Sequence, residues 1–158
     1  MGRNWDNQNV GSIIVSYYKP KNGYASVSFS RAIDMGFPLN VRLDEMAQTP
    51  FGNKLLLAPF YAYDGMNEKG LAIGVLVIQD GKVHQNTGKV PITTTSAIRM
   101  VLDKAATVDE AIELLKNYDM NSSGETGYHF QIADASGNTA VIEYINNEMH
   151  VLTKEEGY

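Results

Sequence analysis

Two segments near the start of the chain have the residue types and alternation of β-strands. Ser12–Tyr18 and Tyr24–Phe29 are rich in β-branched and aromatic residues, and Lys19–Gly23 separates them. The separating segment ends in Asn22 and Gly23, a pair that favours tight turns between antiparallel strands. The pattern therefore predicts a β-hairpin at this end of the chain.

In residues 31–63 the apolar positions follow neither helical nor strand spacing. Residues 31–63 contain Pro38, Pro50 and Pro59, so that short helical turns and a long loop both fit. Irregular segments of this length are often functional, and we expect this one to line a pocket. After it, Leu71–Ile78 is a short apolar run with recurring β-branched residues, which predicts a buried strand.

Helical spacing replaces strand spacing in the middle of the chain. Thr94–Ala105 has one apolar stripe, and a second stripe runs from Val108 to Leu115. Thr107 and Glu110 have the spacing of a capping box, in which the threonine hydroxyl accepts from the N3 amide and the glutamate reaches back. Such a cap contributes about 1 kcal/mol to helix stability.

The last third returns to strand patterns. Strands are predicted at Tyr128–Ala133, Thr139–Tyr144 and Met149–Leu152, with turns at residues 134–137 and 146–147. Strands, two helices and further strands, in that order, are typical of the α+β class. The last strand leaves an open sheet edge, which needs a partner strand, further chain or a second copy, and we therefore expect a homo-oligomer.

The composition is that of one globular domain and excludes several classes of partner. The chain has 158 residues, of which 44% are hydrophobic and 20% charged, and its net charge is −5. We therefore expect a single domain over residues 1–158. Because no basic cluster is present, neither nucleic acid nor an anionic membrane is an expected partner. No apolar run reaches the roughly 18 residues that span a bilayer, and we expect a cytoplasmic protein.

The chain has no cysteine, and its three histidines, His84, His129 and His150, lack metal-ligand spacing. Disulfides, thiolate metal sites and cysteine catalysis within these residues are therefore excluded. Neither a metal ion nor another cofactor is expected.

Two polar segments are candidates for chemistry, Gly2–Asp6 and Asp64–Leu71. Taken singly, each has a structural interpretation. Arg3 and Asp6 can form a surface ion pair worth at most about 1 kcal/mol. Asn67 can hold a polar turn before the following strand.

Together and in this order, the two segments resemble the choloylglycine hydrolase and penicillin V acylase family of linear amide C–N hydrolases. That family has a Gly-Arg-Asn-x-Asp segment shortly after an N-terminal cysteine, and an Asp-Gly-Met-Asn-Glu-Lys-Gly-Leu segment before a core strand. Three later segments also fit: Thr107–Ala111, His129–Gly137 and Val141–Glu143. The acyl-CoA:6-aminopenicillanic acid acyltransferase family shares the layout. The resemblance implies the αββα sandwich of an N-terminal nucleophile hydrolase, of which this chain supplies one helix layer and part of the sheets.

The family chemistry implies roles for three residues. The nucleophile is the thiol of an N-terminal cysteine, and the α-amine of the same residue acts as the base. Arg3 would favour the thiolate, and Asp6 would orient the amine. Asn67 would donate to the oxyanion through its side-chain NH₂ or its main-chain amide. Because the chain has no cysteine, we expect it to be inactive as it stands, and we expect the parent protein to be an amide hydrolase.

Other candidate residues have two interpretations each. Tyr61 and Tyr63 can line an acyl or aromatic substrate pocket, or they can pack in the core or at its rim. His129 invites comparison with a general base, but no Asp or Ser lies at a suggestive spacing, which favours a structural histidine. Glu143 has no second carboxylate with which to form a glycosidase pair.

Three functions fit the sequence. The first is hydrolysis of a linear amide, such as a bile-salt conjugate, penicillin V or another N-acyl amine. The second is acyl transfer to an amine with water excluded, and the third is a non-catalytic relative that binds acyl ligands or pairs with another chain. The expected partner of either enzyme is a small-molecule amide. A cysteine codon in frame upstream of Met1 would favour the hydrolase.

Overall fold

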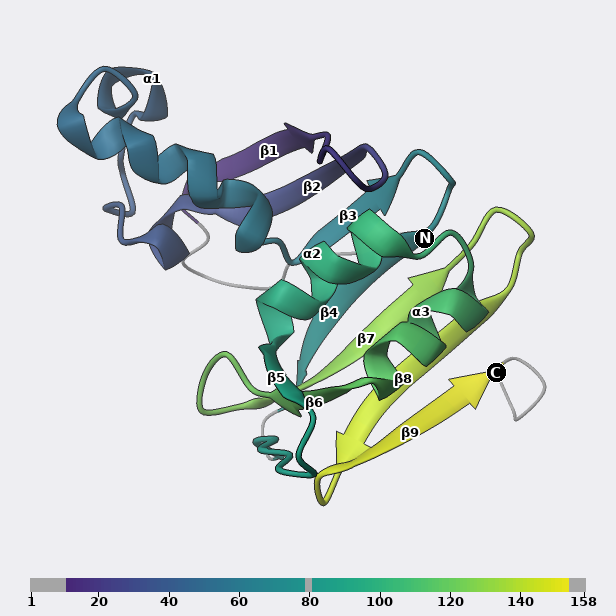
Figure 1. Ribbon diagram of the computed structural model, residues 1–158. Helices are drawn as coiled ribbons and strands as arrows, with labels where there is room; N and C mark the ends of the chain where they lie inside the picture. Colours follow the sequence, from purple (N-terminus) through teal and green to yellow (C-terminus); the bar gives the residue numbers. More distant parts are fainter. Residues whose placement is uncertain (1–10, 79–80, 154–158) are drawn as a thin grey trace.

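A seven-stranded antiparallel sheet dominates the structure. The computed structural model describes residues 11–78 and 81–153. Within the sheet, neighbouring strands follow the order β1-β2-β3-β4-β7-β8-β9. These strands are β1 (Ile13–Tyr18), β2 (Ser26–Arg31), β3 (Asp64–Asn67), β4 (Ala72–Ile78), β7 (Gly127–Ala133), β8 (Thr139–Ile145) and β9 (Glu148–Thr153). Two longer helices come between β4 and β7 in the chain, and the predicted α+β class is confirmed (Figure 1).

The predicted hairpin forms β1 and β2, which pair over their whole length. Its turn lies against the C-terminal end of helix α2 (Thr94–Lys104). There the main-chain N–H of Tyr24 donates to the carbonyl oxygen of Asp103 at 3.0 Å. A Cβ atom on Gly23 would lie 2.7 Å from that same oxygen, so the close approach of hairpin and helix requires glycine.

The Asp64–Leu71 segment forms β3 and the turn into β4. Gly70 lies in this turn with a φ of 83°, a left-handed conformation that glycine adopts at little steric cost. Strand β4 then runs between β3 and β7 at the centre of the sheet. Its Ile73 and Val75 are buried, and the buried strand predicted from the apolar run is confirmed.

Residues 31–63 fold into short helices that form a lobe beside the sheet. These helices are η1 (Ala32–Met35), α1 (Leu43–Met46) and η2 (Pro50–Phe60). The lobe projects from the side of the sheet that carries β1 and β2 (Figure 1), and it has a small core around Phe37 and Ala58. Of the two alternatives for this segment, short helical turns are correct. Pro50 begins η2, at a position where a missing N–H costs nothing.

Helices α2 and α3 (Val108–Lys116) pack on one face of the sheet (Figure 1). Their apolar stripes face inward, and Leu102 and Leu115 belong to the same core as Phe130 and Ile142 of the sheet. Burial of a side chain of this size stabilises the fold by roughly 1.5–3 kcal/mol. The contact between the helix pair and the sheet therefore provides the main apolar burial of the molecule.

The start of α3 differs in one detail from the sequence prediction. The Thr107 hydroxyl accepts from the Glu110 N–H at 3.2 Å, as predicted. The Glu110 carboxylate, however, accepts from the N–H of Ala106 and not from that of Thr107. A complete capping box begins α2 instead, where Thr93 and Ser96 each accept from the main-chain N–H of the other.

A small parallel sheet that the sequence analysis missed joins β5 (Val90–Thr93) to β6 (Tyr118–Asn121). Strand β5 leads into α2 and β6 follows α3, so the pair ties the two helices together at one end. The buried carboxylate of Asp119 accepts from the hydroxyl and N–H of Thr87 and from the N–H of Lys89. The bond from the Thr87 hydroxyl is the main reason why the pKa of Asp119 lies below its ordinary value.

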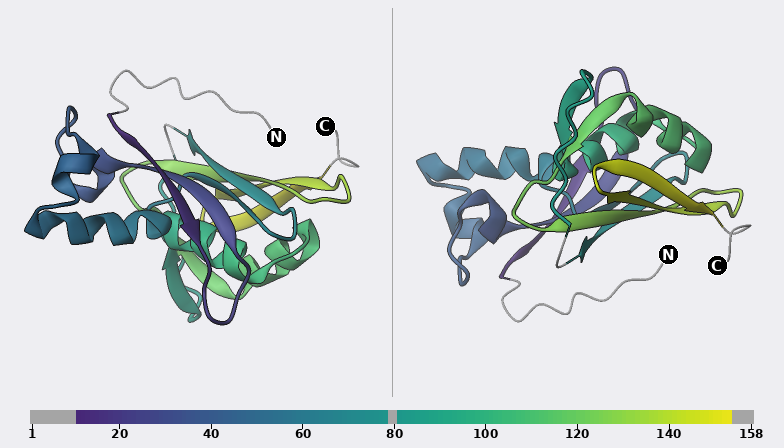
Figure 2. Two further views of the ribbon diagram at one scale, coloured as in Figure 1. Left: turned by 90° about the horizontal axis from the view of Figure 1, so that it is seen from above. Right: turned by 90° about the horizontal axis from the view of Figure 1, so that it is seen from below.

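The other face of the sheet carries no helix in the described part of the chain (Figure 2). On β1 this face presents Val15 and Tyr17, which are 62% and 70% exposed, whereas Ser26, Ser28 and Ser30 of β2 are buried on the helix side. In a half-buried strand the apolar residues normally face the core. The hairpin has the opposite arrangement, which indicates that the bare face is built to be covered by another layer.

Candidate functional site

The three residues to which the resemblance assigns catalytic roles lie only partly within the described structure. Arg3 and Asp6 lie outside the described residues, and their roles stay predictions. Asn67 is described, at the end of β3, where only 4% of its surface is exposed.

Asn67 uses all of its polar groups in internal hydrogen bonds. Its Nδ2 atom donates to the carbonyl oxygens of Leu102 and Ala105, at 3.0 and 2.7 Å. Its Oδ1 atom accepts from the N–H groups of Lys69 and Leu71, at 3.0 and 3.1 Å. Its own main-chain N–H donates to the carbonyl oxygen of Leu71 at 2.9 Å.

These bonds correct the expectation for Asn67. An oxyanion donor needs a free N–H aimed at the reacting carbonyl, but both amide protons and the main-chain proton of Asn67 are already bound. The last carbonyl groups of a helix have no partner within the helix. Asn67 provides that partner for α2 and holds the β3–β4 turn at the same time, which is a structural role.

A pocket of about 360 Å³ lies where the lobe, β4 and the start of α2 meet. Tyr61 and Tyr63 both line it, as does Tyr128 of β7. The remaining lining residues are Arg31, Asp34, Val75, Thr94, Thr95 and Ser123. The expectation that residues 31–63 line a pocket is therefore confirmed, and substrate binding by Tyr61 and Tyr63 stays a prediction.

Among the described residues that line this pocket, only Arg31 and Asp34 are charged. Nε and Nη2 of Arg31 donate to the two carboxylate oxygens of Asp34, at 2.9 and 2.7 Å, and Nη2 also donates to the Tyr63 hydroxyl oxygen at 3.0 Å. The bond to Asp34 raises the pKa of Arg31 above its ordinary value, and burial raises the pKa of Tyr63. The guanidinium thus stays charged, the phenol stays neutral, and the bidentate geometry fixes the orientation of the guanidinium.

Hydroxyl groups form the side of the pocket nearest α2. The Thr94 hydroxyl accepts from the N–H of Ser123, and the Ser123 hydroxyl accepts from the N–H of Thr95. These bonds join the start of α2 to the loop that precedes β7. The pocket wall therefore consists of segments that the fold holds together, although they lie far apart in the sequence.

Sequence reasoning did not single out Arg31, Asp34 or Tyr128. The separation of three residues between Arg31 and Asp34 is common for ion pairs on helical turns, and it is the one local signal. Tyr128 gives no such signal, because it reaches the pocket from a strand that lies far from Tyr61 and Tyr63 in the sequence.

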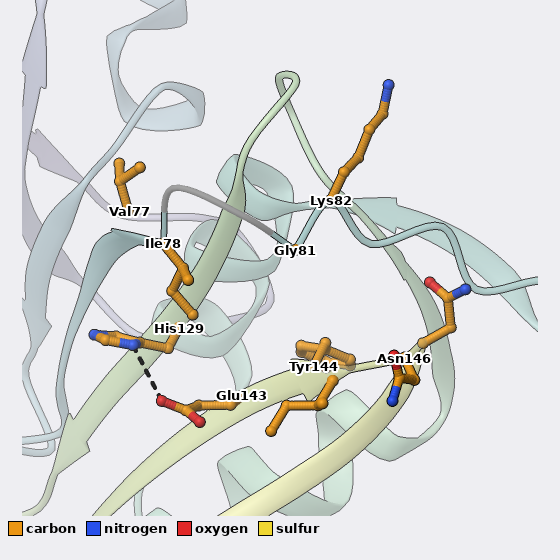
Figure 3. A pocket seen from close by; sticks show the side chains of 10 residues that line it. Val77, Ile78, Gly81, Lys82, His129, Glu143, Tyr144 and Asn146 are labelled. Atoms are coloured by element: carbon orange, nitrogen blue, oxygen red, sulfur yellow. Dashed lines mark ion pairs between the residues drawn. The ribbon is translucent and has the colours of Figure 1, made fainter.

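A wider hollow of about 870 Å³ lies at the end of β4, next to β7 and β8 (Figure 3). His129 and Glu143 face each other in it, with Nδ1 3.2 Å from Oε1. At this distance they form an ion pair only when His129 is protonated, and the buried Nδ1 has no well-aligned hydrogen bond. Lys82 points away from the pair in Figure 3 and binds Glu125. No serine or threonine is among the described residues that line the hollow, which favours the structural interpretation of His129.

Within residues 11–78 and 81–153, no three His, Cys, Asp or Glu side chains are grouped so that they could hold a metal ion. None of the described helices combines the length and apolar character needed to cross a membrane.

Comparison with known proteins decides the family. The family model described as linear amide C–N hydrolases, choloylglycine hydrolase family, matches residues 24–158. The chain belongs to this family. The matched residues include β2, the Asp64–Leu71 segment, both long helices and β7 to β9.

Relatives in the choloylglycine hydrolase family are longer proteins. A penicillin V acylase of Pectobacterium atrosepticum is 35% identical over 96 residues, which make up 54% of this chain and 26% of that protein. The structure of a penicillin V acylase from Agrobacterium tumefaciens is 27% identical, with a TM-score of 0.55 over 82% of this chain and 33% of that one. A variant of conjugated bile acid hydrolase from Clostridium perfringens is 22% identical, with a TM-score of 0.55 over 90% of this chain and 42% of that one.

The chain therefore spans less than half the length of these choloylglycine hydrolase relatives. The fold implied by the sequence resemblance is confirmed, because the described residues match part of an N-terminal nucleophile hydrolase fold. In an αββα sandwich one sheet packs its helices on one face and the second sheet on the other. A bare apolar face on a chain of this length is consistent with that architecture.

Proposed function

We propose that the protein to which this chain belongs hydrolyses a linear amide C–N bond, with an N-terminal cysteine as the nucleophile. The observation that carries the proposal is the family match over residues 24–158. The thiol would attack the amide carbonyl and its proton would pass through the α-amine to the leaving amine, after which water would release the acyl group. The substrate is a small molecule, since the pocket in the described structure has the volume of a small-molecule site.

Arg3 and Asp6 keep the roles that the resemblance implies. Arg3 would favour the thiolate through its positive charge, and Asp6 would orient the α-amine. The oxyanion donors are assigned to residues other than Asn67, because Asn67 has no free N–H. Tyr61 and Tyr63 would contact the acyl part of the substrate in the pocket that they line.

The test uses the in-frame sequence upstream of Met1. If it encodes a cysteine, the longer protein should hydrolyse at least one of penicillin V, glycocholate and an N-acyl amine, and replacement of that cysteine by alanine should abolish turnover. Residues 1–158 alone should show no turnover above buffer, because they contain no cysteine.

Two results would contradict the proposal. One is a longer protein that folds and carries the cysteine but cleaves none of the three amides. The other is turnover by residues 1–158 alone that responds to mutation, which would reveal a different nucleophile. If the longer protein forms a new amide from an added amine in place of a free acid, acyl transfer is its function.

A further inference from the structure

The pocket lined by Tyr61, Tyr63 and Tyr128 contains a positive and a negative charge in direct contact. Arg31 and Asp34 are mostly buried, with 18% and 22% of their side chains exposed, and they are joined by a bidentate ion pair. All other residues of the described structure that line the pocket are uncharged. A ligand in the pocket therefore meets a compensated ion pair, three aromatic rings and several hydroxyl groups.

The hydrogen bonds of this pair leave one part of the guanidinium for a ligand. Nε and Nη2 are used by Asp34 and Tyr63, and none of the described residues accepts a bond from Nη1. Because Asp34 and Tyr63 fix the plane of the guanidinium, Nη1 donates in a set direction. Since Arg31 lines the pocket, Nη1 remains available to an acceptor atom on a ligand.

Charge compensation decides which ligands fit. A carboxylate near Arg31 would also lie near Asp34, and the repulsion would offset the attraction while the carboxylate still loses its hydration. A purely apolar group would cover Nη1 and leave a charged donor without a partner. An uncharged group with an acceptor atom avoids both costs, since it pairs with Nη1 and brings no second negative charge.

We infer that this pocket selects uncharged acyl groups of about the size of one ring that present a hydrogen-bond acceptor to Nη1 of Arg31. The inference rests on the proposed function in one respect, since it takes the ligand to be the acyl part of the amide substrate. The pocket has a volume of about 360 Å³, which is near the lower end of the range for small-molecule sites. The three aromatic rings suit a flat group between them, and Asp34 acts as a specificity residue by cancelling the charge of Arg31.

The experiment compares three amides that differ only at the far end of the acyl group. They are (4-hydroxyphenyl)acetamide, phenylacetamide and (4-carboxyphenyl)acetamide. Dissociation constants are measured with residues 1–158 by ligand-observed NMR titration at low salt. The hydroxyl compound should bind several-fold to about tenfold more tightly than the other two, as expected for one hydrogen bond to a charged donor.

Variants of the ion pair should change this order in a defined way. Asp34→Asn leaves the charge of Arg31 uncompensated, and the carboxylate compound should then bind most tightly. The double variant Arg31→Met with Asp34→Asn removes both charges and should bind the hydroxyl and unsubstituted compounds equally. Asp44→Asn is the matched control, because Asp44 forms a similar 2.8 Å pair with Arg42 on the exposed surface, and the order should not change.

Three results would overturn the inference. They are equal or tighter binding of the carboxylate by the unaltered protein, an unchanged order in folded Asp34→Asn, and no binding of any of the three compounds. Thermal melting of each variant shows whether it is folded, and the double variant provides a second test if Asp34→Asn is not. Failure of the proposed function would appear separately, as absence of turnover in the longer protein.

Discussion

Asn67 joins the β3–β4 turn to the end of helix α2 through one buried side chain. It accepts from two N–H groups of its own turn and donates to two carbonyl groups at the end of α2. Removal of such a group leaves several buried partners unsatisfied, which costs more than the loss of a solvent-exposed bond. The sequence shows Asn67 as one polar residue in a turn, and only its partners reveal that it is a fixed structural element.

We expect Asn67→Ala to lower the free energy of unfolding by about 2–4 kcal/mol, because it leaves four main-chain groups without this partner. Urea denaturation monitored by circular dichroism measures the change. Asn117→Ala is the control, since Asn117 is exposed and donates one side-chain bond, to Glu113, and its loss should cost less than about 1 kcal/mol. Similar losses in the two variants would contradict the structural role of Asn67.

At the scale of elements, the start of α3 depends on a residue from another part of the chain. The Asp134 carboxylate, in the turn between β7 and β8, accepts from the N–H of Val108 at 3.1 Å and also from Ser136 and Asn138. Burial opposes ionisation of Asp134, but these bonds outweigh it, and the pKa of Asp134 lies below its ordinary value. The charge also lies at the helix N-terminus, where the helix dipole favours an anion.

This arrangement predicts a pH dependence of stability. Because the pKa of Asp134 is lower in the folded protein than in the unfolded chain, its contribution is complete above the unfolded pKa, about 3.9. The contribution is lost as the pH falls from there through the folded pKa, because the unfolded chain binds the proton first. Asp134→Asn should lower the free energy of unfolding at pH 7 and reduce the further loss of stability at acid pH, measured by urea denaturation from pH 7 to about pH 2.

Asp109→Asn is the control for this prediction. Asp109 is an exposed residue in the first turn of the same helix. Its replacement should leave the loss of stability at acid pH almost unchanged. An equal effect of the two variants would show that the loss of stability at acid pH comes from the net charge near α3 and not from the hydrogen bonds of Asp134.

At the scale of the whole molecule, the two faces of the sheet differ in what covers them. Helices α2 and α3 cover one face, and none of the described helices covers the other (Figure 2). On that bare face Val15, Tyr17, Phe29 and Met66 are between 41% and 70% exposed. Exposed apolar patches of this kind are typical of interaction surfaces. Strands β1 and β9 are the first and last described strands in the order of the sheet.

We expect residues 1–158 on their own to associate as concentration rises, since burial of this face is favourable. Analytical ultracentrifugation should show a rising mean mass, and Val15→Thr combined with Phe29→Gln should reduce it. Leu56→Gln is the control, because Leu56 is 75% exposed but lies in the lobe. A monomer at all concentrations would remove the support for a homo-oligomer. Equal association of the double variant would show that the bare face is not the contact surface.

Elements with strong periodic patterns could be predicted from the amino-acid sequence alone. The hairpin, the strand Leu71–Ile78, the two amphipathic helices and the last three strands each follow from local spacing and turn residues, and the structure confirms them. The family resemblance also came from sequence alone, because the polar segments Gly2–Asp6 and Asp64–Leu71 occur in a recognisable order. The short strands β5 and β6 were missed, since four residues each carry too little pattern.

The roles of the polar residues, in contrast, depend on how distant segments pack together. Arg31, Asp34 and Tyr128 form one pocket with Tyr61 and Tyr63, although they come from separate segments. Asn67 was expected to donate to the oxyanion. Its side-chain amide instead binds the carbonyl groups of Leu102 and Ala105, which lie at the end of a helix distant in the sequence. Periodicity records which face of an element is buried, but the partner of a polar group depends on how the elements pack.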